Sequence, residues 1–150
     1  MKLHRLNIPV QVWIIGIVWL AGCAAKPQPL NYGSDACHSC KMTLADKRFG
    51  AELVTKKGKV FVFDDLNCML SYYHSPDLDP ADLAFTLVID YEHPEEFLEA
   101  GQTFFVKSDQ LRTPMNSQVA AFHSYQDAMQ FKREKGGILL GWAEVTTQFK

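Results

Sequence analysis

The sequence predicts an α+β domain in which two related halves, each a β-hairpin followed by a helix, pack as one small pseudo-twofold unit. The chain has 150 residues and 47% hydrophobic content, which suits a single compact domain. Strand and helix patterns alternate in both halves. In addition, residues 63–72 resemble residues 122–131: each segment begins with a Phe that ends a strand, continues with capping residues, and enters a helix carrying Met and aromatic side chains.

The first half is predicted from β propensity and helical spacing. Residues 50–55 and 60–63 read as two strands joined by the turn 56–59. Asp64 and Asp65 are suited to cap a helix that follows the second strand. The apolar positions of that helix repeat at i, i+3, i+4 and i+7: Leu66, Met69, Leu70 and Tyr73.

The middle of the chain predicts two strands separated by a helical turn. Residues 83–89 form an apolar run that suits a buried strand. A short helical turn is expected at 94–98, with Pro94 at its start and Gly101 beyond its end. Residues 103–107 then predict another strand.

The last part predicts a strand, a helix and a strand. The first strand covers residues 119–122. Ser124, with Asp127 three residues later, has the spacing of a capping box, and glycines 136–137 end the helix. Residues 138–145 predict the final strand.

The N-terminus has the features of a bacterial lipoprotein signal. Lys2 and Arg5 precede an apolar run at residues 10–20, which is shorter than the roughly 20 residues that a membrane-spanning helix needs. The following Leu-Ala-Gly-Cys at residues 20–23 looks like a lipobox, in which Cys23 is lipidated and becomes the first mature residue. The alternatives are an uncleaved membrane anchor and a plain signal peptide with an incidental cysteine.

These features divide the chain into three parts. We expect a lipoprotein signal peptide at 1–22, a lipidated tether at 23–34 and a folded domain at 35–150, held at the cell envelope by its lipid. Loss of the signal peptide removes two basic groups and no acidic group, so the formal net charge changes from −2 to −4. A mildly acidic domain argues against nucleic acid as the partner.

The motif Cys37-His38-Ser39-Cys40-Lys41-Met42 is the most informative stretch of the chain. Thiolate and thioether are soft ligands that select Cu(I), and a thioether adds little to a redox dithiol or a zinc site. With Cys23 lipidated, the remaining thiols are Cys37, Cys40 and Cys68, an odd number that leaves a disulfide framework incomplete.

Two methionines are expected to be ligands. Met69 and Met129 lie on the apolar faces of their predicted helices, where core packing explains them. Met42 and Met115 instead precede strands in irregular segments, where ligands are common. The alternative for Met115 is a loop methionine that half-covers the core.

Three further residues are candidate ligands. His38 lies between the two cysteines of the motif, and His123 follows Met115 in the second half; an ordinary solvated histidine is the alternative for each. Cys68 does not lie on the apolar stripe of its helix. It is either a small buried thiol or a reserve ligand. Lys41 is expected to lower the pKa of the Cys40 thiol.

Other interpretations of Cys37 and Cys40 differ in their requirements. A c-type haem needs a His at the position of Lys41, so the sequence excludes it. A thioredoxin-like dithiol needs a preceding strand, and the sequence predicts none before Cys37. A disulfide between the two cysteines would close a very small ring. Two alternatives stay open: a membrane-tethered thiol-disulfide oxidoreductase using this pair, and a structural zinc-binding lipoprotein that adds Cys68 and His74.

The chain resembles the NosL lipoproteins, copper chaperones for the maturation of nitrous-oxide reductase. The resemblance rests on the lipobox, the Cys-x-x-Cys-x-Met motif, Met115, and the segments 58–69 and 121–137. It implies a non-enzymatic protein that faces the periplasm, binds one Cu(I) and passes it to a copper acceptor associated with a membrane transporter of the maturation machinery. The family's ligands, carried over, fall on Cys37, Cys40, Met42 and Met115.

Overall fold

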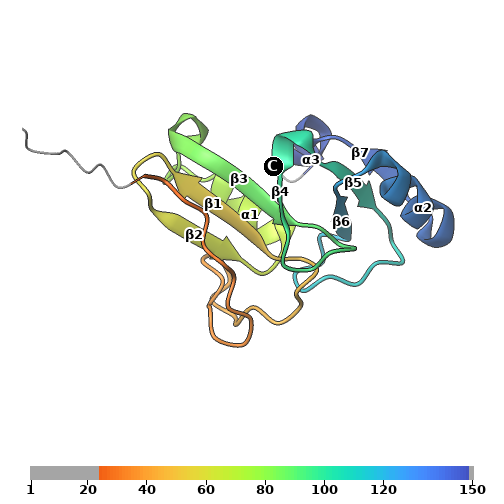
Figure 1. The fold of residues 1–150 in the computed structure, drawn as a ribbon, viewed down its shortest axis with the longest axis horizontal. Helices are drawn as coiled ribbons and strands as arrows, with labels where there is room; N and C mark the ends of the chain where they lie inside the picture. Colours follow the sequence, from red (N-terminus) through yellow and green to blue (C-terminus); the bar gives the residue numbers. More distant parts are fainter. Residues whose placement is uncertain (1–23, 149–150) are drawn as a thin grey trace, which may run out of the picture.

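The computed structural model describes residues 24–148, which form two antiparallel sheets arranged along the long axis of the molecule (Figure 1). Together with three α-helices, these sheets confirm the predicted α+β class. Residues 1–22, expected as a signal peptide, and the expected lipidation site Cys23 lie outside the described residues. Within residues 24–148, no helix has the length and apolar character needed to cross a membrane.

The first sheet has four strands in the order β2-β1-β3-β4. Their bounds are Ala51–Thr55 for β1, Val60–Phe63 for β2, Leu83–Ile89 for β3 and Phe97–Glu99 for β4. In the β1–β2 hairpin, Ala51 pairs with Phe63 and Leu53 pairs with Phe61. Directly paired residues point to the same face of a sheet, so these four side chains share one buried face.

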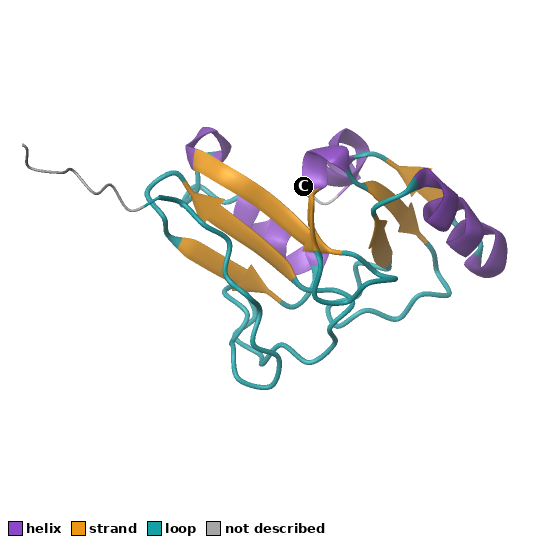
Figure 2. Cartoon of the chain, in the orientation of Figure 1, coloured by secondary structure: helices purple, strands orange, loops and turns teal. Residues whose placement is uncertain are grey.

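Helix α1 (Leu66–Tyr73) follows β2 directly and covers one face of this sheet (Figure 2). The carboxylate of Asp65 accepts a hydrogen bond from the Asn67 backbone N–H, which caps the helix as predicted. Leu66, Met69 and Leu70 are buried, in agreement with the predicted apolar stripe.

The N-terminal segment lies against the other face of the same sheet (Figure 1). The backbone N–H of Gln28 donates to Glu52 Oε1 on β1 at 3.0 Å. Leu30 and Tyr32 pack against the core at Gly50, where an added Cβ would overlap both side chains. The glycine therefore lets the segment approach the sheet closely.

The second sheet has three strands in the order β6-β5-β7, flanked by two helices. The bounds are Phe104–Lys107 for β5, Val119–Phe122 for β6, Tyr125–Lys135 for α2, Ile138–Leu140 for β7 and Trp142–Gln148 for α3. Ser124 caps α2 by accepting from the Asp127 N–H, and Gly136 ends it at φ 68°.

Strand β5 connects two hydrophobic clusters. Phe105 belongs to the larger cluster, which also contains residues of the first sheet and α1, whereas Val106 belongs to a second cluster beneath α2. Successive side chains of a strand point to opposite faces, so one strand serves both clusters. Because the larger cluster contains residues from both sheets, the two halves share a core.

The two halves have the same connectivity. In each, the first strand forms a hairpin with the second, a helix follows, and a third strand pairs antiparallel on the free side of the first strand. The resemblance between residues 63–72 and 122–131 falls on equivalent strand-to-helix junctions. The pseudo-twofold relation in space remains a prediction.

Two predicted elements were wrong. The helical turn expected at 94–98 is replaced by strand β4, because Phe97 pairs with Ile89 on the edge of β3 and Glu95 has a positive φ of 96° that does not continue a helix. The strand expected at 138–145 ends at Leu140, and helix α3 follows. The Gly141 N–H donates to the Glu144 carboxylate, which satisfies a donor at the start of this helix.

Candidate metal centre

The cysteine motif forms a tight turn that brings its two thiols to the same side. Cys37 N–H donates to the Met42 carbonyl at 2.8 Å, and Lys41 N–H donates back to the Cys37 carbonyl at 3.0 Å. Lys41 closes the turn in the left-handed region, with φ 65°. An isolated bridge between Ala36 and Thr43 holds the base of the turn together.

Two hydrogen bonds fix this turn on the first half of the domain. His38 N–H donates to the Val62 carbonyl on β2 at 2.8 Å. Ser39 Oγ donates to the Cys68 carbonyl on α1 at 2.8 Å. The turn is therefore placed where β2 ends and α1 begins.

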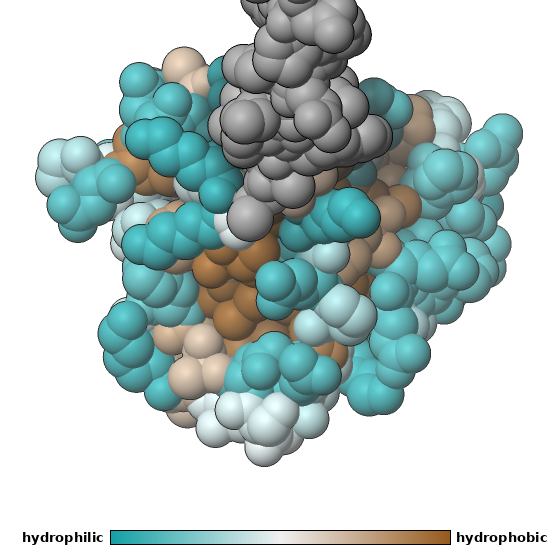
Figure 3. Space-filling model, turned by 60° about the vertical axis from the view of Figure 1, so that its left-hand side comes forward, coloured by the Kyte–Doolittle hydropathy of each residue, from teal (hydrophilic) through white to brown (hydrophobic). Residues whose placement is uncertain are grey.

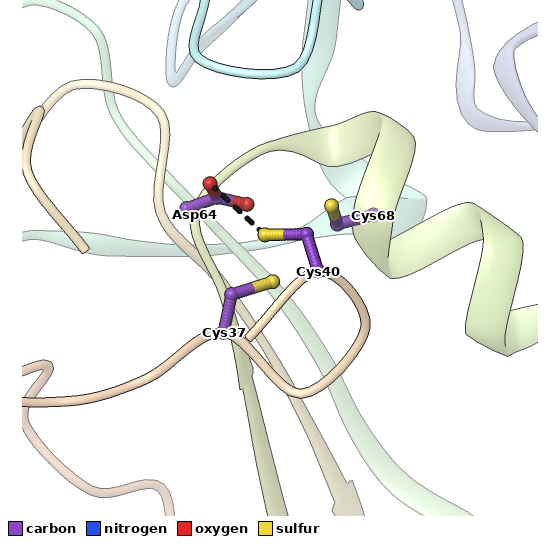
Figure 4. Close-up of side chains that lie close together, drawn as sticks. All are labelled: Cys37, Cys40, Asp64 and Cys68. Carbon is purple, nitrogen blue, oxygen red and sulfur yellow. Dashed lines mark hydrogen bonds between the residues drawn. The ribbon is translucent and has the colours of Figure 1, made fainter. Parts of the chain in front are cut away.

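Four ligand groups converge at this junction. The ligand atoms of Cys37, Cys40, Asp64 and Cys68 all lie within 4.8 Å of one another. Figure 4 shows that they come from three segments: the turn, the end of β2 and the first turn of α1. All three cysteines are free thiols.

Asp64 is a buried carboxylate with an unsatisfied oxygen. Only one of its two oxygens is hydrogen-bonded: Cys40 Sγ donates to Oδ2 at 3.5 Å, while Oδ1 is buried without a hydrogen-bond partner. An unpaired acceptor in the protein interior is costly, and a cation bound among these groups would remove that cost. The residues therefore fit a metal ion.

The thiols have different protonation preferences. A hydrogen bond from Cys68 lowers the pKa of Cys37 and raises the pKa of Cys68, while burial raises the pKa of Cys40. Cys37 is thus the first thiol to ionise. The expected effect of Lys41 is absent: the pKa of Cys40 is raised, and the Lys41 ammonium donates to the His38 carbonyl.

A cavity of about 270 Å³ opens beside the cluster. It is lined by Cys40 and Cys68, by Met115 from the second half, and by polar residues: Ser39, Asn67 and Ser71. The backbone of Met115 is held from both sides, since its N–H donates to Asp65 Oδ2 at 2.8 Å and its carbonyl accepts from Asn67 Nδ2 at 2.9 Å. Both halves of the domain therefore contribute to the site.

The family model of NosL matches residues 30–149. The chain belongs to the NosL family. Among solved structures, one match is the crystal structure of the copper chaperone NosL from Shewanella denitrificans, with a TM-score of 0.67 and 22% sequence identity. The alignment covers 79% of this chain and 94% of that protein. At this identity the match shows a shared fold. A comparison with curated proteins gave no match.

In this NosL chain the predicted ligands have different positions. Cys37 and Cys40 lie in the cluster, and Met115 lines the adjoining cavity. Met42 is 61% exposed and does not line that cavity. Its backbone carbonyl accepts the Cys37 N–H that closes the turn, whereas its side chain is exposed.

The two histidines lie outside the cluster. His38 packs edge-on against Phe61 and Tyr72, with ring centroids 4.8 and 4.5 Å away. His123 is exposed just before α2. Neither ring belongs to the group of converging ligand atoms within the described chain.

Two residues of the site were underestimated or missed by sequence reasoning. Cys68, considered as a reserve ligand, lies within the cluster, and Asp64, considered only as a capping residue, joins it. Their spacing carried a signal: Asp64 ends a strand, Asp65 caps the helix, and Cys68 follows in the first turn. A residue in a first helical turn lies close to the strand end that precedes the cap.

Proposed function

We propose that this protein is a lipid-anchored Cu(I) chaperone that delivers copper for assembly of the copper centres of nitrous-oxide reductase. The observation that carries the proposal is the convergence of three free thiols beside a cavity lined by a methionine. Family membership and the fold shared with a copper chaperone from Shewanella denitrificans support it. The acceptor would be a transporter-associated copper protein of the maturation machinery.

The ligand set suits a cargo ion that must be held and then released. Thiolates of Cys37, Cys40 and Cys68 supply affinity for Cu(I), and the thioether of Met115 supplies a neutral ligand that does not compete with protons. Cu(I) accepts two to four ligands, so a ligand from an acceptor adds before a donor ligand leaves. The partly exposed Cys40 and the cavity give that ligand access.

The proposed cellular location rests on the lipobox-like sequence. Lipidation of Cys23 after removal of residues 1–22 would hold the protein at the membrane, with the domain facing the periplasm. The mass of the N-terminal peptide of the membrane-extracted protein tests this part separately from metal binding. An unmodified Cys23 would contradict it.

The first experiment is a Cu(I) titration of the reduced protein against a competing chelator, with X-ray absorption on the loaded form. We expect one copper per chain in sulfur-rich coordination. Cys68→Ser should lower the affinity by about tenfold or more, and Met115→Leu by about tenfold, because each removes a soft ligand at similar volume. Met129→Leu, on α2 outside the cluster, is the matched control and should bind as the unsubstituted protein does.

A structural zinc site is the second candidate, and Asp64 is the observation that favours it. Three thiolates and one carboxylate match the four-ligand sets of zinc. A structural site would be filled with zinc on isolation and would not exchange metal with an acceptor. Failure of the protein to compete with the Cu(I) chelator, together with stoichiometric zinc, would select this function over the chaperone.

The thiol oxidoreductase has less structural support. Cys37 is fully buried, and the pair lies in a turn ahead of β1, without the helix N-terminus that lowers thiol pKa values in such enzymes. Catalysed disulfide exchange that persists in Met115→Leu would favour the enzyme.

A further inference from the structure

The N-terminal segment is bound to the domain well before the cysteine motif begins. We call residues 28–32 the strap. Its first residue donates to the buried carboxylate of Glu52, and its side chains Leu30 and Tyr32 pack at Gly50 on the outer face of the first sheet. The expected tether 23–34 is thus attached to the sheet from Gln28 onward.

This attachment leaves a short connection to the expected lipid. Only residues 24–27 lie between Cys23 and Gln28. A fully extended chain spans at most about 3.6 Å per residue, so Gln28 lies within about 18 Å of the lipidated residue. A free tether of the whole segment 23–34 would reach about twice as far.

The position of the strap selects the end of the molecule that approaches the membrane. The chain enters at the end of the long axis that holds the β1–β2 turn and the 3₁₀ helix Pro80–Asp82 (Figure 1). Glu52, where the strap begins, is three residues from the end of β1, a distance of about 10 Å along the strand. Helix α2 lies at the opposite end of the molecule.

The β1–β2 turn presents a surface suited to phospholipid headgroups. Lys56, Lys57 and Lys59 are exposed on it. The Lys56 ammonium donates to the Ala81 carbonyl, and that of Lys59 lies 4.6 Å from the centre of the Phe61 ring, so both are held at the surface. Seen from this side, hydrophobic residues form a recessed area framed by hydrophilic side chains (Figure 3).

We propose that the strap holds this end of the domain against the bilayer, with the lysines of the β1–β2 turn on lipid phosphates. The inference rests on lipidation of Cys23 but does not depend on which metal is carried. It places the sulfur cluster at the far end of β2, about 13 Å from the turn along the four-residue strand. A partner would then reach the cavity from the aqueous side.

The short connection to the lipid contributes more to the contact between the β1–β2 turn and the headgroups than the lysine charges do. Three aspartates line the same hollow of about 300 Å³ as the lysines: Asp77, Asp79 and Asp82. Lysines near an anionic surface strengthen binding to it, and the aspartates offset much of this attraction. A short connection raises the effective concentration of the lysines at the headgroups without any new contact.

The test is lysine acetylation of the lipidated, full-length protein in vesicles of phosphatidylethanolamine and phosphatidylglycerol. A water-soluble acetylating reagent is used, and each lysine is read by mass spectrometry. The comparison variant carries about twenty Gly/Ser residues inserted between Ala25 and Lys26, which lengthens the connection and leaves the strap intact. Lys135 on α2 is exposed at the opposite end of the molecule and serves as the internal control.

We expect Lys57 to react at least about fivefold more slowly in the natural chain than in the insertion variant, with Lys135 unchanged. Equal rates for Lys57 in the two proteins would overturn the proposal, whether both react fast or both are protected, since the short connection would then have no effect. An N-terminal peptide without lipid would overturn it as well. Cu(I) affinity, measured on the same protein, reports separately on the proposed function.

Discussion

At the scale of single residues, Asp65 links the two halves of the site. One carboxylate oxygen accepts the Asn67 N–H that caps α1, and the other accepts the Met115 N–H from the second half. The residue is fully buried, so both bonds are shielded from water. One side chain therefore sets the start of the helix that carries Cys68 and the position of the methionine beside it.

Asp65→Asn should separate these two roles. Asparagine caps helices as well as aspartate, but its amide nitrogen cannot accept the second hydrogen bond. We expect a loss of about 1–3 kcal/mol in the free energy of unfolding, measured with urea, and weaker Cu(I) binding. Asp79→Asn, at the cap of the exposed 3₁₀ helix, is the control and should change stability by less than about 0.5 kcal/mol. Unchanged stability and copper affinity in Asp65→Asn would contradict this role.

Glu52 makes stability depend on pH. Burial raises the pKa of Glu52 from 4.5 to about 7, because only the Gln28 N–H compensates the charge and Oε2 has no partner. The folded state therefore binds this proton more tightly than the unfolded state. Its contribution to stability is fully present below pH 4.5 and is lost as pH rises through 7.

Glu52→Gln should remove this dependence. Relative to the unsubstituted protein, we expect the variant to gain up to about 3 kcal/mol in the free energy of unfolding above pH 7, and little at pH 4.5. Urea unfolding at several pH values measures the difference. The exposed Glu134→Gln is the control, with no expected trend. A constant difference between Glu52→Gln and the unsubstituted protein across this range would argue against a buried, protonated Glu52.

At the scale of elements, the link between α2 and β7 depends on two glycines. Gly137 has φ 100°, and a Cβ there would overlap the Lys107 carbonyl on β5. A side chain at position 137 is therefore disfavoured both by the backbone conformation and by the lack of room beside β5. The glycines thus allow β7 to turn back onto β5 immediately after the helix ends.

Gly137→Ala should be strongly destabilising. We expect a loss of about 2–4 kcal/mol in the free energy of unfolding, because strain and backbone overlap add. Gly101→Ala is the matched control, since nothing lies within 4 Å of its added Cβ, and it should change stability by less than about 1 kcal/mol. Thermal unfolding of both variants measures this difference in stability, and equal melting temperatures would contradict the prediction.

At the scale of the whole molecule, the two halves are joined by a shared core and by the site itself. Trp142 on α3 contacts Tyr73 of the first half and Phe105 of the second, with ring centroids 5.7 and 6.1 Å away. Met115 is held by residues of α1 and its cap. Unfolding of either half would expose the larger cluster in both.

The domain should therefore unfold as one unit. Trp142 is the one tryptophan among the described residues, and its fluorescence reports on the junction between the halves. We expect its urea transition to coincide with that of the far-ultraviolet circular dichroism signal. A fluorescence transition at lower urea than the dichroism transition would show that the halves separate before they unfold.

Local patterns were sufficient to predict much of the fold. Alternating strands, the Asp65 and Ser124 caps and the glycines after α2 each act within a few residues of their position, and the structure confirms them. Strand β4 was missed because its pairing with β3 overrides the local helical pattern of Pro94 and the residues after it.

The sequence by itself determined the α+β class, the family and the cysteine motif, because these depend on local spacing and on short motifs. Tertiary structure decided which residues share the site. Asp64 and Cys68 meet the motif only because the turn docks on Val62 of β2, and Met115 joins them through hydrogen bonds that span about fifty positions of the chain. The same docking leaves Met42 exposed. Long-range contacts of this kind leave no local pattern in a single sequence, because loop closure brings together residues that have no fixed separation along the chain.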